Sequence, residues 1–201
     1  MSHYYSKTQD DIESNPQDFV FNFKGLSLKF KTDNGVFSKE YIDYGSFALL
    51  KEFKPNDLEY PILDMGAGYG PIGITISKLF NKKTIMVEIN ERAYNLCKEN
   101  ILFNKSNSEV INSSLYDDIN DMKFSSIVTN PPIRAGKDIV FNIYDGAYKH
   151  LALNGELWVV IQKKQGAPSS KAHIEELFGN CEIVNRDRGY YILRAVKKEE
   201  N

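Results

Sequence analysis

The chain has 201 residues and a formal net charge of −2, and 42% of its residues are apolar, enough to bury a substantial core. The protein as a whole has no excess of basic residues, so its net charge would not attract long nucleic acid. A nucleic-acid partner would have to bind a local basic patch on the surface. Two cysteines, Cys97 and Cys181, lie far apart in the sequence and argue against both a disulfide scaffold and a zinc site.

The sequence predicts a soluble, cytoplasmic protein. No basic and then apolar leader opens it, and no apolar run approaches about 18 residues, so we expect neither a signal peptide nor a membrane span. Residues 1–17 are polar and predict a flexible N-terminal arm. We expect a single domain over residues 18–201, in which an extension over residues 18–57 precedes a core over residues 58–201.

The predicted elements alternate along most of the chain. Apolar and polar residues alternate from Phe19 to Phe30 across Lys24-Gly25, which predicts a β-hairpin. Asp43 can cap a helix that runs to Phe53. The later strands are predicted at residues 62–65, 84–88, 109–112, 124–129, 157–161, 182–185 and 190–196. The later helices are predicted at residues 72–80, 90–103, 139–151 and 171–178.

This alternation predicts an α/β fold with a Rossmann-like, mainly parallel sheet of seven strands and helices on both faces. The last two strands are joined by a short link that contains Asp187-Arg188-Gly189, so they are predicted to form an antiparallel hairpin. In open parallel sheets, ligands lie beyond the carboxyl ends of the strands. The residues directly after each strand are therefore the candidate site.

A glycine-rich turn follows the first of these seven strands. Gly66, Gly68 and Gly70 allow backbone angles closed to other residues, and they leave no side chain between the turn and a ligand. Pro71 suits the first turn of the helix that follows. Such a turn binds nucleotide-like molecules in many folds, although a tight turn without a ligand has the same pattern.

Glu88 ends the next strand, about 20 residues beyond the glycines. At this distance an acidic side chain can accept hydrogen bonds from both hydroxyls of a ribose. An exposed acid at a strand end is the alternative. Because the glycine turn and the acid occur together at this spacing, we favour a ligand that contains a nucleoside.

The segment Asn130-Pro131-Pro132-Ile133 follows the fourth strand. Two prolines could simply end a strand. They also form a stiff turn with free carbonyls, and with the Asn130 side-chain oxygen the segment presents two acceptors to one planar NH₂ group. Holding both N–H bonds favours the pyramidal geometry in which such an amine attacks an electrophile, and stabilises the positive charge that develops.

Taken together, these motifs resemble the class I S-adenosyl-L-methionine-dependent methyltransferases. The resemblance is to the small methyltransferase domain group, typified by RsmC-like ribosomal RNA guanine-N2 methyltransferases of the single-domain bacterial type. It extends to Gly35-Val36-Phe37-Ser38, Gly45-Ser46 and Gly155-Glu156-Leu157-Trp158. It implies S-adenosylmethionine as the cofactor and ribosomal RNA or a ribosomal subunit particle as the partner, with small-subunit 16S rRNA favoured.

The resemblance assigns the motif residues to two ligands. Residues that would hold the cofactor are Asp64, Gly66, Ala67, Gly68, Gly70 and Glu88 and, where the family places a lid, Phe37, Ser38 and Ser46. Residues that would hold the target amine are Asn130, Pro131, Pro132 and Ile133. RNA phosphates would meet Arg134, Lys163 and Lys164, although an ordinary solvated face explains these cations equally well.

Two positions depart from the family pattern. The residue after Asn-Pro-Pro is usually aromatic and stacks on a flipped base, but here it is Ile133, so stacking would come from elsewhere, such as Phe37. The acidic residue common after the third strand, near the adenine amine, appears as Ser114, with Asp117 as a loose substitute. The contacts to adenine are therefore the least defined part of the predicted site.

Other functions stay open. Enzymes with Asn-Pro-Pro also methylate protein glutamine at N5, because that amide carries the same two N–H bonds. A cofactor-binding domain without catalysis is a third reading, disfavoured by the intact glycine turn, Glu88 and Asn130-Pro131-Pro132. A nicotinamide dehydrogenase would explain the glycine turn but not Asn-Pro-Pro. The spacing of His3, His150 and His173 indicates no metal site.

Overall fold

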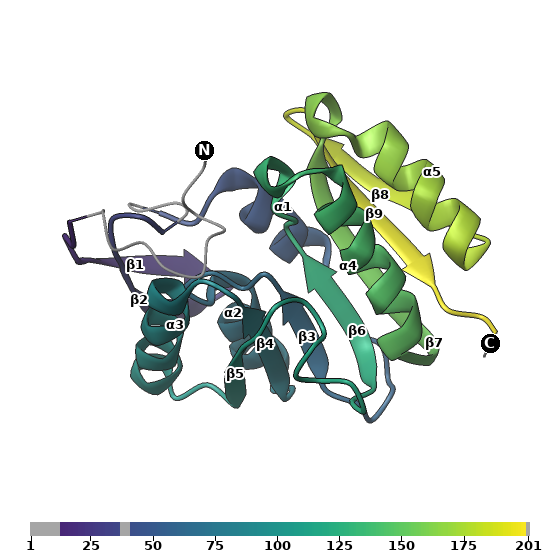
Figure 1. Cartoon of the computed structure of the whole chain (residues 1–201). Coiled ribbons are helices and arrows are strands. Elements are labelled where there is room, and N and C mark those ends of the chain that lie inside the picture. The colour runs from purple at the N-terminus through teal and green to yellow at the C-terminus, as the bar shows by residue number, and fades with distance from the viewer. Residues whose placement is uncertain (1–12, 37–40, 200–201) are drawn as a thin grey trace.

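The computed structural model describes residues 13–36 and 41–199 of the chain. It contains a seven-stranded sheet of order β5-β4-β3-β6-β7-β9-β8 and a two-stranded sheet β1-β2 (Figure 1). The strands are β1 (Gln17–Phe23), β2 (Leu26–Thr32), β3 (Ile62–Met65), β4 (Thr84–Glu88), β5 (Ser108–Asn112), β6 (Phe124–Thr129), β7 (Leu151–Gln162), β8 (Glu182–Asp187) and β9 (Tyr190–Val196). The helices are α1 (Tyr44–Glu52), α2 (Pro71–Phe80), α3 (Glu91–Asn104), α4 (Lys137–His150) and α5 (Ala167–Phe178), with short 3₁₀ turns η2 (Ile133–Ala135) and η3 (Lys163–Gln165).

The structure confirms the predicted α/β fold with a mainly parallel sheet of seven strands. Neighbouring strands from β5 to β7 pair in parallel, whereas β9 runs antiparallel to both β7 and β8. The strand order reverses at β3, because the chain proceeds from β3 to β4 and β5 and then returns to place β6 on the other side of β3. A cleft is expected where the order reverses, so the ends of β3 and β6 should face one ligand site.

Helices cover both faces of this sheet (Figure 1). Leu63 and Met65 of β3 pack into the core formed with α4 and α5, whereas Ile62 packs into the core formed with α1 and α2. This alternation follows from the two-residue period of a strand. Among the described residues, no helix is long and apolar enough to cross a membrane.

Two boundaries differ most from the sequence-based prediction. The strand predicted to begin at residue 157 begins at Leu151, which pairs with Phe124, and a shift in register follows before the pairs continue. The segment 162–170, predicted as a loop, contains η3 and the first turn of α5, with Pro168 in that turn. Proline is tolerated there because its missing N–H would have no helical partner, so it marked a helix start rather than a loop.

The hairpin β1-β2 lies beside α3 (Figure 1). Asn100 and Asn104 of α3 pair with the backbone of Lys31 and Lys29 through both ends of their amide groups, at 2.7–3.0 Å. These bonds satisfy the polar groups along the outer edge of β2, which would otherwise be open to another strand. Asn100 also donates to the carbonyl of Tyr69, 2.9 Å away. One buried side chain thus joins the hairpin to the glycine turn.

Candidate active site

A cavity of about 560 Å³ opens where the strand order reverses. Its wall combines residues that follow strands with residues from the segment before α1 and from the start of β9. The wall includes Asp43, Ser46, Gly66, Ala67, Gly68, Glu88, Ser114, Asn130, Pro131, Pro132, Ile133, Arg134, Gln162 and Tyr190. Its volume is in the range of small-molecule sites. The predicted cofactor turn and the predicted amine site therefore share one cavity.

The glycines of the turn divide into two kinds. Gly66 and Gly68 have φ of +77° and +59°, and a Cβ built on either would meet no atom within 4 Å. A Cβ on Gly70 would instead lie 2.8 Å from Cys97 Sγ, behind the turn. The first two glycines thus leave open space in front of the backbone, as a ligand lying on the main chain requires. This arrangement fits the predicted cofactor.

The Glu88 carboxylate fastens the glycine turn to the end of β4. One oxygen accepts from the Gly68 N–H at 2.8 Å and the other from the Asn90 N–H at 2.7 Å. Burial raises the pKa of Glu88, and these backbone N–H bonds oppose that rise. Because Glu88 also lines the cavity, the remaining lone pairs of its carboxylate are placed to accept from the hydroxyls of a ribose.

Asp64 lies behind the turn instead of on the cavity wall. Its side chain is fully buried, and Oδ2 accepts from the Gly73 N–H at 2.8 Å. Desolvation raises the pKa of Asp64 to about 7, and the nearby charge of Glu88 adds to the rise. Asp64 would therefore affect cofactor binding indirectly. Its bond to Gly73 fixes the start of α2 and, with it, the shape of the glycine turn.

The Asn130 amide is held in one orientation at the end of β6. Its Nδ2 donates to Asp43 Oδ1 at 3.1 Å and to Ser46 Oγ at 3.2 Å. Among the described residues, none donates a hydrogen bond to Asn130 Oδ1. Since Asn130 lines the cavity, its acceptor oxygen is available to a ligand there.

The carbonyls of the two prolines are not free, and that prediction is wrong. The Pro131 carbonyl accepts from the Ile133 N–H, and the Pro132 carbonyl accepts from the Ala135 N–H, each at 2.9 Å. Pro132 has φ −76° and ψ 77°, the geometry of an inverse γ-turn, which directs the Ile133 N–H back to Pro131. A carbonyl oxygen has two lone pairs, so Pro131 retains one for a substrate amine.

The predicted site residues fall into three groups. Those that line the cavity are Ser46, Gly66, Ala67, Gly68, Glu88, Ser114, Asn130, Pro131, Pro132, Ile133 and Arg134. Those in the described part of the chain that do not line it are Asp64, Gly70, Lys163 and Lys164. Phe37 and Ser38 lie outside the described residues.

The sequence reasoning missed two kinds of wall residue. Asp43 was assigned only as a helix cap, which it is, since Oδ1 also accepts from the Ser46 N–H. Gln162 and Tyr190 are partners in register, at the end of β7 and the start of β9. Because β9 is antiparallel to β7, its first residue lies at the ligand edge. The short link between the last two strands could have indicated this position.

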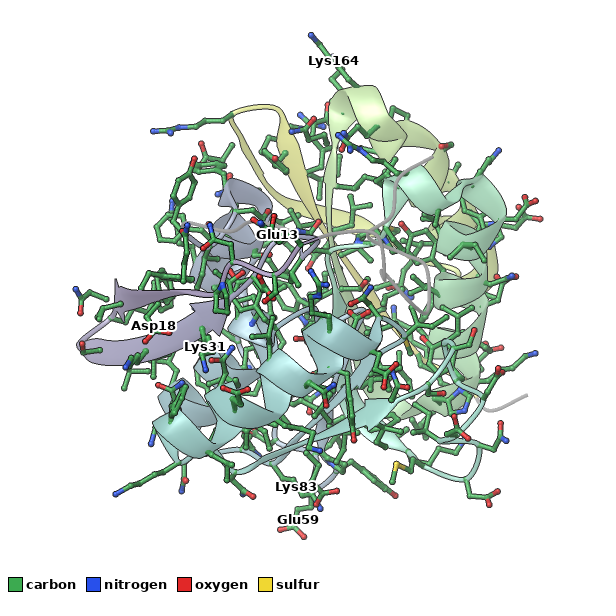
Figure 2. All side chains as sticks on the ribbon, turned by 60° about the vertical axis from the view of Figure 1, so that its left-hand side comes forward. Glu13, Asp18, Lys31, Glu59, Lys83 and Lys164 are labelled. Atoms are coloured by element: carbon green, nitrogen blue, oxygen red, sulfur yellow. The ribbon has the colours of Figure 1, made fainter. Side chains whose placement is uncertain are left out.

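Some of the basic side chains lie close to this edge. Lys163 and Lys164 are exposed in η3, and the Lys163 N–H donates to the carbonyl of Gly189 in the β8-β9 turn. Arg188 of that turn lies over the ring of Tyr44 at 4.7 Å. In Figure 2, Lys164 extends away from the protein at the end opposite Lys83. Of the three cations predicted to meet phosphates, only Arg134 lines the described part of the cavity.

Comparison with known proteins places this chain among methyltransferases. The family model described as "Methyltransferase small domain" matches residues 27–194. A Bacillus subtilis protein named "Uncharacterized protein YbxB" is 44% identical over 97% of this chain and 98% of its own length. Ribosomal RNA small subunit methyltransferase C of Erwinia tasmaniensis is 30% identical over 85% of this chain.

The structural comparison agrees in fold. The chain superposes on T. thermophilus RsmC, a 16S rRNA N2 methyltransferase in complex with AdoMet and guanosine, with a TM-score of 0.83 over 91% of this chain at 22% identity. The match covers 51% of that protein, and the match to the Erwinia enzyme covers 50% of it. The chain therefore spans about half the length of these rRNA methyltransferases.

Replacing Asp64 with Asn tests its burial behind the turn. With its pKa raised from 3.8 to about 7, the folded chain keeps a proton that the unfolded chain releases, so folding stability falls as pH rises through this window and is constant above it. In urea unfolding without cofactor, we expect the free energy of unfolding of Asp64→Asn to rise relative to that of the wild type by about 4 kcal/mol between pH 4 and pH 8. A difference in stability that does not change with pH would contradict this burial.

Replacing Glu88 with Gln tests its two bonds. An amide NH₂ would face one of the two backbone N–H donors, and one donor would lose its partner. We expect calorimetry to show affinity for S-adenosylmethionine about tenfold to a hundredfold lower. Glu91→Gln, at an exposed position three residues along the chain, is the matched control. Equal affinity in both variants would remove Glu88 from the cofactor site.

Proposed function

The chain belongs to the methyltransferase small domain family, and we propose that it methylates the exocyclic N2 of a guanine in ribosomal RNA. Family membership confirms the predicted class, an S-adenosylmethionine-dependent methyltransferase. The named substrate of the RsmC relatives, small-subunit rRNA, supports the acceptor. We therefore favour 16S rRNA, as free RNA or within a ribosomal subunit particle.

One observation carries the proposal: Asn130 presents an acceptor oxygen to the cavity that the glycine turn also lines. S-adenosylmethionine supplies an electrophilic methyl group. Asn130 Oδ1 and the second lone pair of the Pro131 carbonyl would accept the two N–H bonds of the substrate amine. They would hold the nitrogen in line for attack and stabilise its growing positive charge, before one proton is lost to solvent.

The cavity wall offers a surface for a flat base. Two aromatic residues lie on the described part of this wall, Tyr69 and Tyr190. Tyr69 is 2% exposed and packs against Phe19 and Phe30, whereas Tyr190 is half-buried. Tyr190 is thus better placed than Ile133 to stack on a base turned out of its helix. Arg134, Lys163 and Lys164 would then meet the phosphates around it.

A second candidate is the N5-methylation of a protein glutamine. Its side-chain amide offers the same two N–H bonds to Asn130 and Pro131. The aliphatic side chain at Ile133 favours this candidate, because an amide has no ring to stack.

The proposed function is tested by nucleoside mapping. We expect rRNA from source cells that lack the protein to be short of one N2-methylguanosine, as measured by mass spectrometry. The purified protein with labelled S-adenosylmethionine should restore that methyl group. Label that appears in a ribosomal or other protein, with the rRNA unlabelled, would overturn the rRNA proposal in favour of a glutamine acceptor.

The same assay tests the role of Asn130. Asn130→Ala should bind S-adenosylmethionine normally but transfer methyl groups about 10²- to 10³-fold more slowly, because the transition state loses one hydrogen-bond acceptor. Asn120→Ala, at an exposed position outside the cavity, is the control. Full activity of Asn130→Ala would exclude this mechanism.

A further inference from the structure

The orientation of the Asn130 amide depends on a residue outside the Asn-Pro-Pro motif. Asp43 lies 87 positions earlier in the sequence, and its Oδ1 accepts from Asn130 Nδ2 at 3.1 Å. The Ser46 hydroxyl lies 3.2 Å from the same nitrogen. The segment before α1 and the end of β6 therefore meet at this amide.

The carboxylate decides which end of the amide faces the cavity. An ionised carboxylate only accepts hydrogen bonds, whereas an asparagine side chain has one donor end and one acceptor end. If the Asn130 amide turned by about half a rotation, two acceptor oxygens would face each other and the bond to Asp43 would be lost. The NH₂ group therefore faces Asp43, and Oδ1 faces the opposite side. Ser46 alone would not fix this choice, because a hydroxyl both donates and accepts.

We infer that Asp43 is a positioning residue that holds the Asn130 oxygen toward the cavity, so that the site selects an acceptor group with N–H donors. This inference rests on the proposed methyl transfer to an amine and names the residue that sets its specificity. A base with a keto oxygen at that position would bring an acceptor against an acceptor and be rejected.

Asp43 also caps α1, so the test must separate two roles. Its Oδ1 accepts from the Ser46 N–H at 3.1 Å. Serine is an equally good helix cap, but its hydroxyl ends one bond earlier and would not reach Asn130. Asp43→Ser therefore keeps the cap and removes the bond to the amide. Asp43→Asn keeps an acceptor oxygen for both partners, because the cap holds that oxygen toward the helix.

The first measurement follows the amide itself and needs no acceptor. The side-chain NH₂ signals of Asn130 in a ¹⁵N NMR spectrum are identified by their loss in Asn130→Ala. We expect them to exchange slowly with solvent in the wild type and in Asp43→Asn, and at least several-fold faster in Asp43→Ser. Unchanged shifts and exchange in Asp43→Ser would overturn the inference.

The second measurement is methyl transfer to rRNA. We expect kcat to fall about tenfold to a hundredfold in Asp43→Ser, with the Kd for S-adenosylmethionine and the unfolding midpoint unchanged, and Asp43→Asn to recover most of the rate. Asp57→Ser, at an exposed position before β3, is the control. Full kcat in Asp43→Ser, or an equal loss in Asp43→Asn, would overturn the inference. A wild-type protein inactive on rRNA would instead count against the proposed function, while the NMR result still decides the orientation.

Discussion

Two buried carboxylates hold the glycine turn, and the cavity depends on that turn. Glu88 binds the backbone of Gly68 from the neighbouring strand, and Asp64 binds that of Gly73 at the start of α2. Burying two acids side by side costs free energy, which is why the pKa of each is raised. The cost is offset by backbone N–H bonds that fix the turn with its open side toward the cavity. The described cavity wall has two acidic residues, Asp43 and Glu88, and one basic residue, Arg134. This excess of acidic residues favours a cationic ligand, and S-adenosylmethionine carries a sulfonium.

The second half of the site is fixed by contacts between distant segments. The end of β6 supplies Asn130, the N-cap and first turn of α1 supply Asp43 and Ser46, and the antiparallel strand β9 supplies Tyr190. The reversal of strand order at β3 brings these parts together, because β6 lies directly beside the strand that carries the glycine turn. A cofactor and an amine are thereby expected to meet in one cavity. This topology explains why Gly68 and Asn130, which are far apart in the sequence, line one cavity.

The sequence was most informative where function requires a particular local geometry. The sequence pattern placed the glycine turn, Glu88 and Asn130 at strand ends. Gly66, Gly68, Glu88 and Asn130 do line the cavity, whereas Gly70 does not. The sequence was least informative where contacts between distant segments determine the local structure. The bond from Asn130 to Asp43 and the early start of β7 at Leu151 both depend on partners remote in the chain. The Pro131 carbonyl was predicted to be free, but in the turn that follows it accepts a hydrogen bond from the Ile133 N–H.

The most direct measurement of this account is a crystal structure of the protein with S-adenosylhomocysteine, the product form of the cofactor. We predict that the ribose hydroxyls bond to Glu88 and that the main chain of Gly66 to Gly68 lies against the ligand. The sulfur should face Asn130 Oδ1 across the cavity. A ligand bound elsewhere, or one whose sulfur points away from Asn130, would contradict the claim that the two halves form one methyl-transfer site.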